Sequence, residues 1–202
     1  MIHPDTELQF INNAVGYGVV AKKLIPKGTI TWVQDELDQV FTNSESAALS
    51  PLMRQYLETY CFTNGLGDHV LCWDNAKFVN HSFTPNCLST AYDFEIAIRD
   101  IYPGEQLTDD YGYLNVSEPF EGIDEGTERK IVYPDDILQY HAQWDRQIKD
   151  RFLDINHVAQ PLEKFIPLHT WNEFQKVIDG SAELKSIITC YYDPAIERSK
   201  AS

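Results

Sequence analysis

The residues most suggestive of chemistry stand together in one short segment, Asn80 to Asn86 (NHSFTPN), where an amide, an imidazole and a hydroxyl are adjacent. A histidine beside a serine raises the possibility of a serine hydrolase. In an extended segment, however, the side chains of His81 and Ser82 point to opposite faces and cannot share a proton. No G-x-S-x-G turn surrounds the serine, and nothing in the sequence marks partners for a Ser-His-Asp site. The pattern therefore disfavours a hydrolase.

Two other motifs stand in a fixed order around this segment. The run GYG, Gly16 to Gly18, precedes a strand-like stretch and a Pro-Gly turn, and GEQLTDDYG, Gly104 to Gly112, ends in an aromatic residue and a glycine. Each motif alone is common in proteins. Together and in this order, they resemble the SET domain of protein-lysine methyltransferases, and the resemblance covers roughly Val15 to Tyr113.

The resemblance implies a fold that is mainly β. SET domains are β-clip-like arrangements of small sheets, in which the Asn-His-Ser segment and the final strand pack through one another as a pseudoknot. With a C-terminal α-helical unit added, the fold class is α+β overall. We expect a SET domain over residues 1–118 and a C-terminal helical extension over residues 119–202 that packs on it.

The resemblance also implies S-adenosylmethionine as the cofactor, with a substrate lysine that enters from the opposite side through a narrow channel. Tyr17 and Gly18 are expected to contact the cofactor through the backbone, where glycine permits a close approach. Asn80 and His81 are expected to hold its methionine and adenine parts, largely by main-chain groups. Tyr111 matches the tyrosine beside the transferred methyl group, so it is the expected catalytic residue as well as a cofactor contact.

Other aromatic and acidic residues are assigned by position. Tyr60 and Phe62 are candidates for lining the lysine channel, and core packing is an equal alternative for each. Trp32 and Trp73 are assigned to the core. Asp109 is a third candidate for the substrate channel. It is also a departure, because many family members have Phe or Tyr two residues before the catalytic tyrosine, where that residue influences how many methyl groups are added. Mono-, di- and trimethylation therefore all stay open.

The resemblance breaks down at the zinc site of many SET domains. That site joins a cysteine after Asn-His-Ser to three cysteines of a post-SET segment, but here Phe83 holds the first position and no cysteine follows Glu118–Glu121. We therefore expect no metal site and no zinc. Another element must close the substrate channel, and the C-terminal helices are the natural candidate, through Tyr133, Tyr140 or Trp144. A helical unit that only packs on the sheet is the alternative.

The positioning elements can be predicted for the first half of the chain. Val19–Ala21 and Thr29–Val33 are short β-rich runs, separated by a turn at Pro26–Gly28 in which proline sets φ and glycine allows the reversal. Ser50 is a suitable N-cap and Pro51 suits the first turn of a short helix. Many short strands with few helices favour a largely antiparallel β fold.

The second half of the chain changes to helical periodicity. Residues 134–153 carry apolar side chains at helical spacing, with acids at the start as the helix dipole prefers. A second helix is predicted from a capping box at Thr170 and Glu173, with Gly180 at its end. Residues 181–192 have the pattern of a further helix.

Charge restricts the partners. The chain has 202 residues, with 31 acidic and 16 basic side chains and a formal net charge of -15. Such a chain repels a phosphate backbone, which disfavours direct nucleic-acid binding. The same field attracts a basic, lysine-containing protein, such as a histone-like or ribosomal protein. Acidity that only keeps the protein soluble is the open alternative.

No apolar run approaches the roughly 18–20 residues that span a bilayer, and the start lacks the pattern of a signal peptide. We therefore expect no membrane association and a cytoplasmic location, or a nuclear one in a eukaryote. The leading function is transfer of a methyl group to a lysine of a basic protein. The alternatives are a catalytically inactive SET-fold module that binds a peptide or the cofactor, and methylation of a small amine or of another type of residue. The sequence leaves the oligomeric state open.

Overall fold

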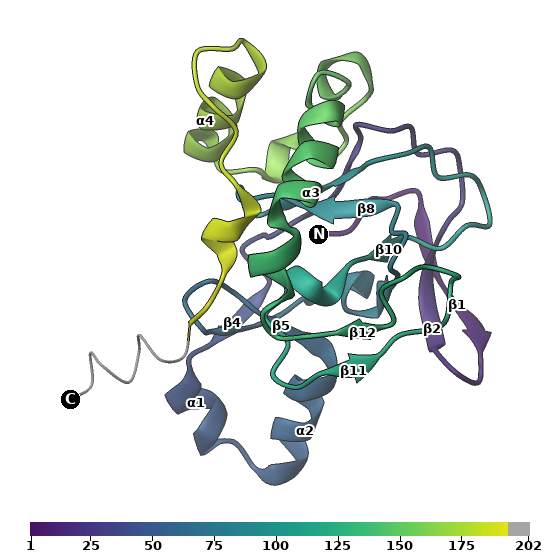
Figure 1. The fold of residues 1–202 in the computed structure, drawn as a ribbon, viewed down its shortest axis with the longest axis vertical. Coiled ribbons are helices and arrows are strands. Elements are labelled where there is room, and N and C mark those ends of the chain that lie inside the picture. The colour runs from purple at the N-terminus through teal and green to yellow at the C-terminus, as the bar shows by residue number, and fades with distance from the viewer. Residues whose placement is uncertain (194–202) are drawn as a thin grey trace.

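The computed structural model describes residues 1–193, which form short strands, four α-helices and several 3₁₀ turns (Figure 1). The strands are β1 (Thr6–Asn12), β2 (Gly16–Ala21), β3 (Ile30–Val33), β4 (Gln39–Phe41), β5 (Cys61–Thr63), β6 (His69–Leu71), β7 (Asn80–His81), β8 (Cys87–Ser89), β9 (Phe94–Ala97), β10 (Thr108–Asp109), β11 (Phe120–Glu121) and β12 (Ile131–Val132). The helices are α1 (Asn43–Ala48), α2 (Pro51–Tyr60), α3 (Asp136–Phe152) and α4 (Leu168–Ile178). Among these helices, none is long and apolar enough to cross a membrane. The predicted α+β class of small sheets with helices is confirmed.

The central sheet of the core has the order β3-β9-β8 and is antiparallel. Its inner face is apolar, with Ile30, Leu88 and Ile96 fully buried. On the other face, Trp32 is paired with Glu95, and Glu95 is paired with Ser89 on the next strand. Cross-strand partners project to the same face. A row of three side chains therefore crosses that face of the sheet.

The Pro26–Gly28 turn forms as predicted and locks the strands to the C-terminal part of the chain. Gly28 adopts a φ of +83°, which side chains with a Cβ rarely adopt. Its N–H donates to the Ala97 carbonyl at 2.7 Å, and its own carbonyl accepts from the Gln160 amide at 2.8 Å. A Cβ at this position would lie 2.6 Å from Cβ of Asp154. Only glycine fits both the backbone and the space.

We expect Gly28→Ala to destabilise the protein strongly. The positive φ costs roughly 1 kcal/mol, and forcing a methyl group against the Asp154 backbone adds about 1–3 kcal/mol. Gly126→Ala is the matched control, because Gly126 also has a positive φ, +77°, but open space around its Cα. Urea denaturation of both variants checks this. Equal losses in the two would contradict the steric part of the argument.

The C-terminal helices share one core with the central sheet. Ile137, Trp144 and Ile148 of α3 are buried at the spacing the sequence predicts, and Phe174 of α4 joins them against Phe94 of β9. In Figure 1, α3 and α4 lie at the opposite end of the molecule from α1 and α2. Residues 136–178 therefore complete the core of the strands. The division into 1–118 and 119–202 stays a prediction.

Two predictions for the C-terminal part are wrong. Thr170 does not cap α4, because that helix begins at Leu168 after Pro167 and Thr170 is buried within its first turn. Residues 181–192 do not form a further α-helix, since only Ile187–Cys190 coils, as a single 3₁₀ turn. Asp145 on α3 accepts from the Ile187 main chain at 2.8 Å, so this stretch docks on α3 by side-chain bonds.

The motif-bearing strands β7 and β10 form a two-stranded parallel sheet. Thr108 pairs with Asn80 and Asp109 pairs with His81. Beyond the strands, the Asn86 side chain donates to the Gln106 carbonyl at 2.7 Å and accepts from the Thr108 N–H at 2.8 Å. The NHSFTPN segment and the GEQLTDDYG segment are thus interlocked, as expected of a SET-like pseudoknot.

Candidate active site

The GYG motif meets the NHS motif at Asn80. The Asn80 side-chain amide donates to the Tyr17 carbonyl at 3.1 Å and to the Gln106 side chain at 2.9 Å. A Cβ on Gly18 would lie 2.9 Å from that amide nitrogen and would also press on the Gln106 amide. A side chain at position 18 would therefore disturb the contact. The structure brings Tyr17, Gly18 and Asn80 together.

His81 is held neutral and does not serve Ser82. Its Nδ1 accepts a hydrogen bond from the Tyr111 N–H at 3.2 Å, so the ring proton resides on Nε2. Burial lowers the pKa of His81, and the Arg129 cation lowers it further. The carboxylates of Asp110 and Glu125 act in the opposite direction. The buried Nε2 has no hydrogen-bond partner among the described residues. With its Nδ1 lone pair occupied by the Tyr111 N–H and its proton on Nε2, the neutral ring has no free lone pair and cannot act as a general base.

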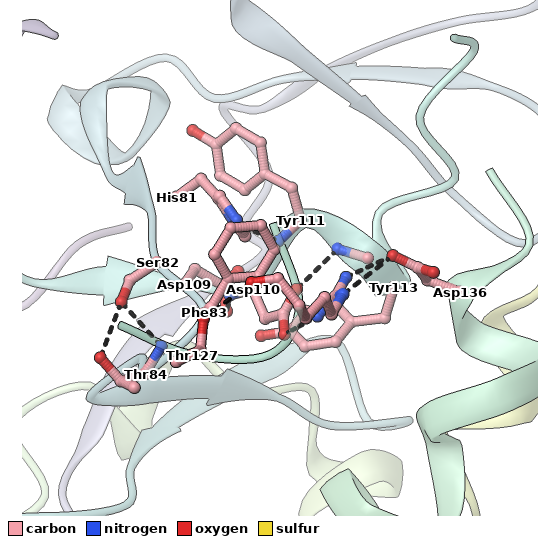
Figure 2. Close-up of polar contacts among 12 residues, drawn as sticks. His81, Ser82, Phe83, Thr84, Asp109, Asp110, Tyr111, Tyr113, Thr127 and Asp136 are labelled. Carbon is pink, nitrogen blue, oxygen red and sulfur yellow. Dashed lines mark hydrogen bonds and ion pairs between the residues drawn. The ribbon is translucent and has the colours of Figure 1, made fainter. Parts of the chain in front are cut away.

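Ser82 is fixed by a residue from outside the motifs. Glu125 accepts from the Ser82 hydroxyl at 3.0 Å, from the Phe83 N–H at 2.9 Å and from the Thr84 N–H at 3.1 Å. The Ser82 hydroxyl also accepts from the Thr84 N–H, which Figure 2 shows. The hydroxyl is thus used to shape the turn after β7, which agrees with the rejection of a hydrolase.

Tyr111 bridges the motifs. It opens the 3₁₀ turn Tyr111–Tyr113, and its hydroxyl donates to the Val79 carbonyl at 2.6 Å. Burial raises the pKa of Tyr111, and the negative charges of Asp109 and Glu95 raise it further. The phenol is therefore a hydrogen-bond donor at every physiological pH and is no proton acceptor.

A cavity of about 530 Å³ opens on one side of Tyr111. Three of its lining residues are those predicted for the substrate channel: Tyr60, Phe62 and Asp109. Tyr17, Gly18, Asn80 and His81, the residues predicted for the cofactor, do not line it. Tyr111 therefore separates a corner built by the motifs from a cavity walled mainly by apolar and aromatic side chains. The assignments of individual site residues stay predictions.

A β-hairpin after the third motif covers this region. Phe120 of β11 packs edge-on against His81 at 5.5 Å and against Tyr111 at 6.1 Å between ring centroids. Residues of 114–120 and of the 187–190 turn line the cavity, whereas Tyr133, Tyr140 and Trp144 are not among its described lining residues. The chain after the motifs closes the cavity through other residues than the three the sequence suggested.

Arg129 ties this covering segment to the third motif. Its guanidinium forms ion pairs with Asp110 (2.5 Å) and with Asp136, whose side chains are 3% and 2% exposed. Figure 2 shows Asp136 on its helix, with dashed contacts reaching toward the motif. Rings of Phe83 and Tyr140 lie within 5.1 Å and 4.9 Å of the guanidinium carbon. This arginine holds α3 against the site, beside Phe83, which stands where many SET domains have the first cysteine of the zinc site.

Comparison with known families decides the identity of the motif-bearing part. A model of the SET domain matches residues 16–112. This part of the chain is a SET domain. The match spans GYG, NHSFTPN and the run ending at Gly112, so it supports methyltransferase activity in general terms.

Solved structures and curated proteins add little to the SET-domain match. Among 223 matching chains of known structure is a candidate histone methyltransferase from Plasmodium falciparum, at 16% identity and a TM-score of 0.40. The match covers 62% of this chain and 100% of that one. A score this low carries no argument about function. A comparison with curated proteins finds no match.

The cysteines show no sign of a metal site. Among residues 1–193, no group of three or more His, Cys, Asp or Glu side chains is placed to hold a metal ion. Burial raises the pKa of Cys61 and of Cys190 to about 11, so both are protonated thiols rather than thiolate ligands. The absence of zinc stays a prediction.

Several residues of this region were not found from the sequence. Glu95, Phe120, Glu125 and Arg129 carry no motif and reach the site from distant elements. Trp32 was assigned to the core, and it is buried, but it also lines the cavity. Trp73 was assigned to the core wrongly. It is 43% exposed, and its indole N–H donates to Asp35 at 3.1 Å.

Proposed function

We propose that this SET domain transfers a methyl group from S-adenosylmethionine to a lysine side chain of a basic protein. The observation that carries the proposal is the position of Tyr111. Its ring lines the cavity, while its main-chain nitrogen is bonded to His81 in the motif corner, outside the cavity wall. A cofactor at the corner and a substrate in the cavity would approach each other beside this one side chain.

The residues at the corner fit the cofactor. Tyr17 leaves half its surface exposed next to the close-packed Gly18, and its ring contacts Phe78 at 6.4 Å. Such a partly open aromatic edge suits a flat heterocycle. The buried, unpartnered Nε2 of His81 leaves one donor for a bound group. When bound, the cofactor supplies an electrophilic methyl group on a sulfonium sulfur. Tyr17, Gly18, Asn80 and His81 would hold it.

The cavity fits a lysine side chain. A free lysine has a pKa near 10.4 and must lose a proton before it can act as a nucleophile. The walls formed by Tyr60, Phe62 and Phe120 would desolvate the ammonium and lower that pKa. The same walls cover the four-carbon stem, so the chain selects a long amine by shape as well as by charge.

The substrate class is proposed from the charge of the whole molecule. A formal net charge of -15 attracts a basic partner and raises its encounter rate at low salt. Histone-like and ribosomal proteins have this chemistry. Transfer should therefore weaken as ionic strength rises, since exposed charges are screened beyond about 8 Å at physiological salt.

The test is transfer of a tritium-labelled methyl group from S-adenosylmethionine to histones, ribosomal proteins and a cell lysate. We expect label on protein, and peptide mapping should place it on lysine. Label on free amines alone would replace the protein substrate by a small amine. Cofactor binding by calorimetry without transfer to any substrate would favour a binding module and contradict the proposal.

A further inference from the structure

Three polar side chains form a row in the wall of the cavity. Trp32, Glu95 and Ser89 are cross-strand partners on β3, β9 and β8, and all three line the cavity. The Ser89 hydroxyl donates to Glu95 at 3.4 Å. The central sheet thus presents a carboxyl group, flanked by an indole and a hydroxyl, to a space that is otherwise largely apolar.

A second carboxyl group meets Glu95 from the third motif. Asp109, on β10, is 2% exposed, lines the same cavity and is hydrogen-bonded to Glu95 through its side chain. Its other contact is the Asp110 N–H at 2.9 Å. Two carboxyl groups in contact cannot both ionise at low cost, so the pair shares a proton. This pair stands two residues before Tyr111.

The surroundings keep that proton on Asp109. Burial raises the pKa of Asp109 well above its ordinary value, and the charges of Glu95 and Asp110 raise it further. Burial also raises the pKa of Glu95, to about 7, although the hydrogen bond from Asp109 lowers it. The charged or titratable groups that interact with the pair are Asp110, Tyr111, the thiols of Cys72 and Cys87, and the N-terminal ammonium of Met1.

An independent feature of the wall indicates a missing ligand. Trp32 is 6% exposed, and its indole Nε1 has no hydrogen-bond partner among the described residues. A buried donor without an acceptor destabilises the folded state. Because Trp32 lines the cavity beside Glu95, a peptide that places an ammonium group on the carboxyl pair can offer a backbone carbonyl to this N–H.

We propose that Glu95 and Asp109 bind the ammonium group of the substrate and that Glu95 takes its proton. The inference deepens the methyl-transfer proposal and rests on it for the identity of the amine. A lysine that enters between Tyr60 and Phe62 meets the carboxyl pair in the wall shared with Tyr111. Asp109 donates its hydrogen bond to Glu95 throughout and positions the accepting carboxylate.

The proton balance of this step is simple. The ammonium N–H bond breaks, its electron pair stays on nitrogen, and the proton forms an O–H bond with Glu95. The ion pair of ammonium and carboxylate becomes a neutral amine beside two protonated carboxyl groups. No co-reactant is needed. General-base assistance of this kind contributes about 10²–10⁴-fold in rate, most when the pKa of the base lies near the working pH.

The first arm of the test is the pH dependence of kcat/KM for Glu95→Gln. In the wild type, we expect kcat/KM to rise through a pKa of about 7, that of Glu95, and then to level. In the variant, kcat/KM should fall about 10²-fold at pH 7 and rise continuously toward the pKa of free lysine, near 10.4. Glu36→Gln, at an exposed glutamate, is the matched control. An unchanged profile in Glu95→Gln would overturn the proposal.

The second arm needs no methyl transfer. ¹³C NMR of the glutamate carboxyl groups follows the titration of Glu95, identified by its loss in Glu95→Gln. Adding n-butylammonium should move this titration to lower pH, because a bound cation favours the ionised carboxylate. The carboxyl signal of the exposed Glu36 should not respond to n-butylammonium. A Glu95 titration that ignores n-butylammonium would overturn the proposal, whatever the kinetics show.

The two arms separate the two proposals. A wild type that responds to n-butylammonium but transfers no methyl group would support the ammonium site and refute the methyltransferase. If the wild type and Glu95→Gln transfer methyl groups equally well, the methyltransferase proposal stands and the ammonium site is refuted.

The pH dependence of Tm shows whether Glu95→Gln is folded and whether Glu95 is as buried as the structure has it. The folded pKa of Glu95 is about 7, above its unfolded value near 4.3. Between these values the unfolded chain holds fewer protons, so wild-type stability falls as the pH rises. The Tm of the wild type should therefore drop relative to Glu95→Gln between about pH 5 and pH 8. A constant difference would place Glu95 in water and contradict the shared proton.

Discussion

Replacing Arg129 by methionine is expected to destabilise the protein by about 3–5 kcal/mol, because it leaves two buried carboxylates without their counter-ion. Asp110 and Asp136 are 3% and 2% exposed, and Arg129 bridges them. Their remaining contacts are main-chain N–H groups, of Gly112 at 2.9 Å and Tyr133 at 2.9 Å. Two such dipoles do not balance two charges in an apolar setting.

The measurement is the free energy of unfolding in guanidinium chloride. Lys130→Met is the matched control, since the adjacent Lys130 pairs with Asp124 at the surface, where solvent screens the ion pair and its loss should change the free energy of unfolding little. Neutralising both acids as well, in the triple variant with Asp110→Asn and Asp136→Asn, should recover much of the loss. A loss below about 1 kcal/mol for Arg129→Met would mean that water reaches the ion pairs of Arg129 with Asp110 and Asp136 in solution.

Tyr111→Phe is expected to reduce the rate of methyl transfer by about 10²-fold, the scale of loss when a reacting group is misplaced. Phenylalanine keeps the ring that lines the cavity, but it loses the hydroxyl bonded to the Val79 carbonyl at 2.6 Å. The main-chain bond from residue 111 to His81 stays, because it does not involve the side chain. We therefore expect the affinity for S-adenosylmethionine to be retained while the rate of methyl transfer falls.

Single-turnover kinetics and calorimetric cofactor binding separate these effects. We expect a slow step in Tyr111→Phe with an affinity for S-adenosylmethionine close to that of the wild type. Tyr102→Phe, at a tyrosine that is 56% exposed, should change neither quantity. A variant at position 111 that transfers within a few-fold of the wild-type rate would remove Tyr111 from the catalytic role.

The motif-bearing residues could be placed from the sequence because their neighbours are themselves motif residues. Asn80 contacts Tyr17, and His81 contacts Tyr111, so three short runs suffice to build the corner. The helix after Ser50 was equally local, since its cap and its first-turn proline lie within the segment. Local chemistry and one family resemblance were enough for this half of the site.

The other half depends on contacts that no local pattern encodes. Glu125 reaches Ser82 across 43 residues, and nothing in a polar loop distinguishes it from its acidic neighbours. Glu95 carries no motif, and only the register with Trp32 shows which face of the sheet it shares. Thr170 had the spacing of a capping box, but the N-cap is Pro167, three residues earlier, and the helix begins at Leu168. Tertiary packing decided each case.

The reach of Glu125 and Arg129 back to the motifs has a consequence for the order of assembly on the ribosome. A nascent chain that stops at Gly112 carries all three sequence motifs but has neither the carboxylate that shapes the Ser82–Thr84 turn nor the cation that neutralises Asp110. Such a chain contains every residue that the sequence motifs identify, but it lacks the groups that hold those residues in place. The growing polypeptide therefore cannot present a working site before its later segment has been synthesised and folded back, and truncated translation products should be inert.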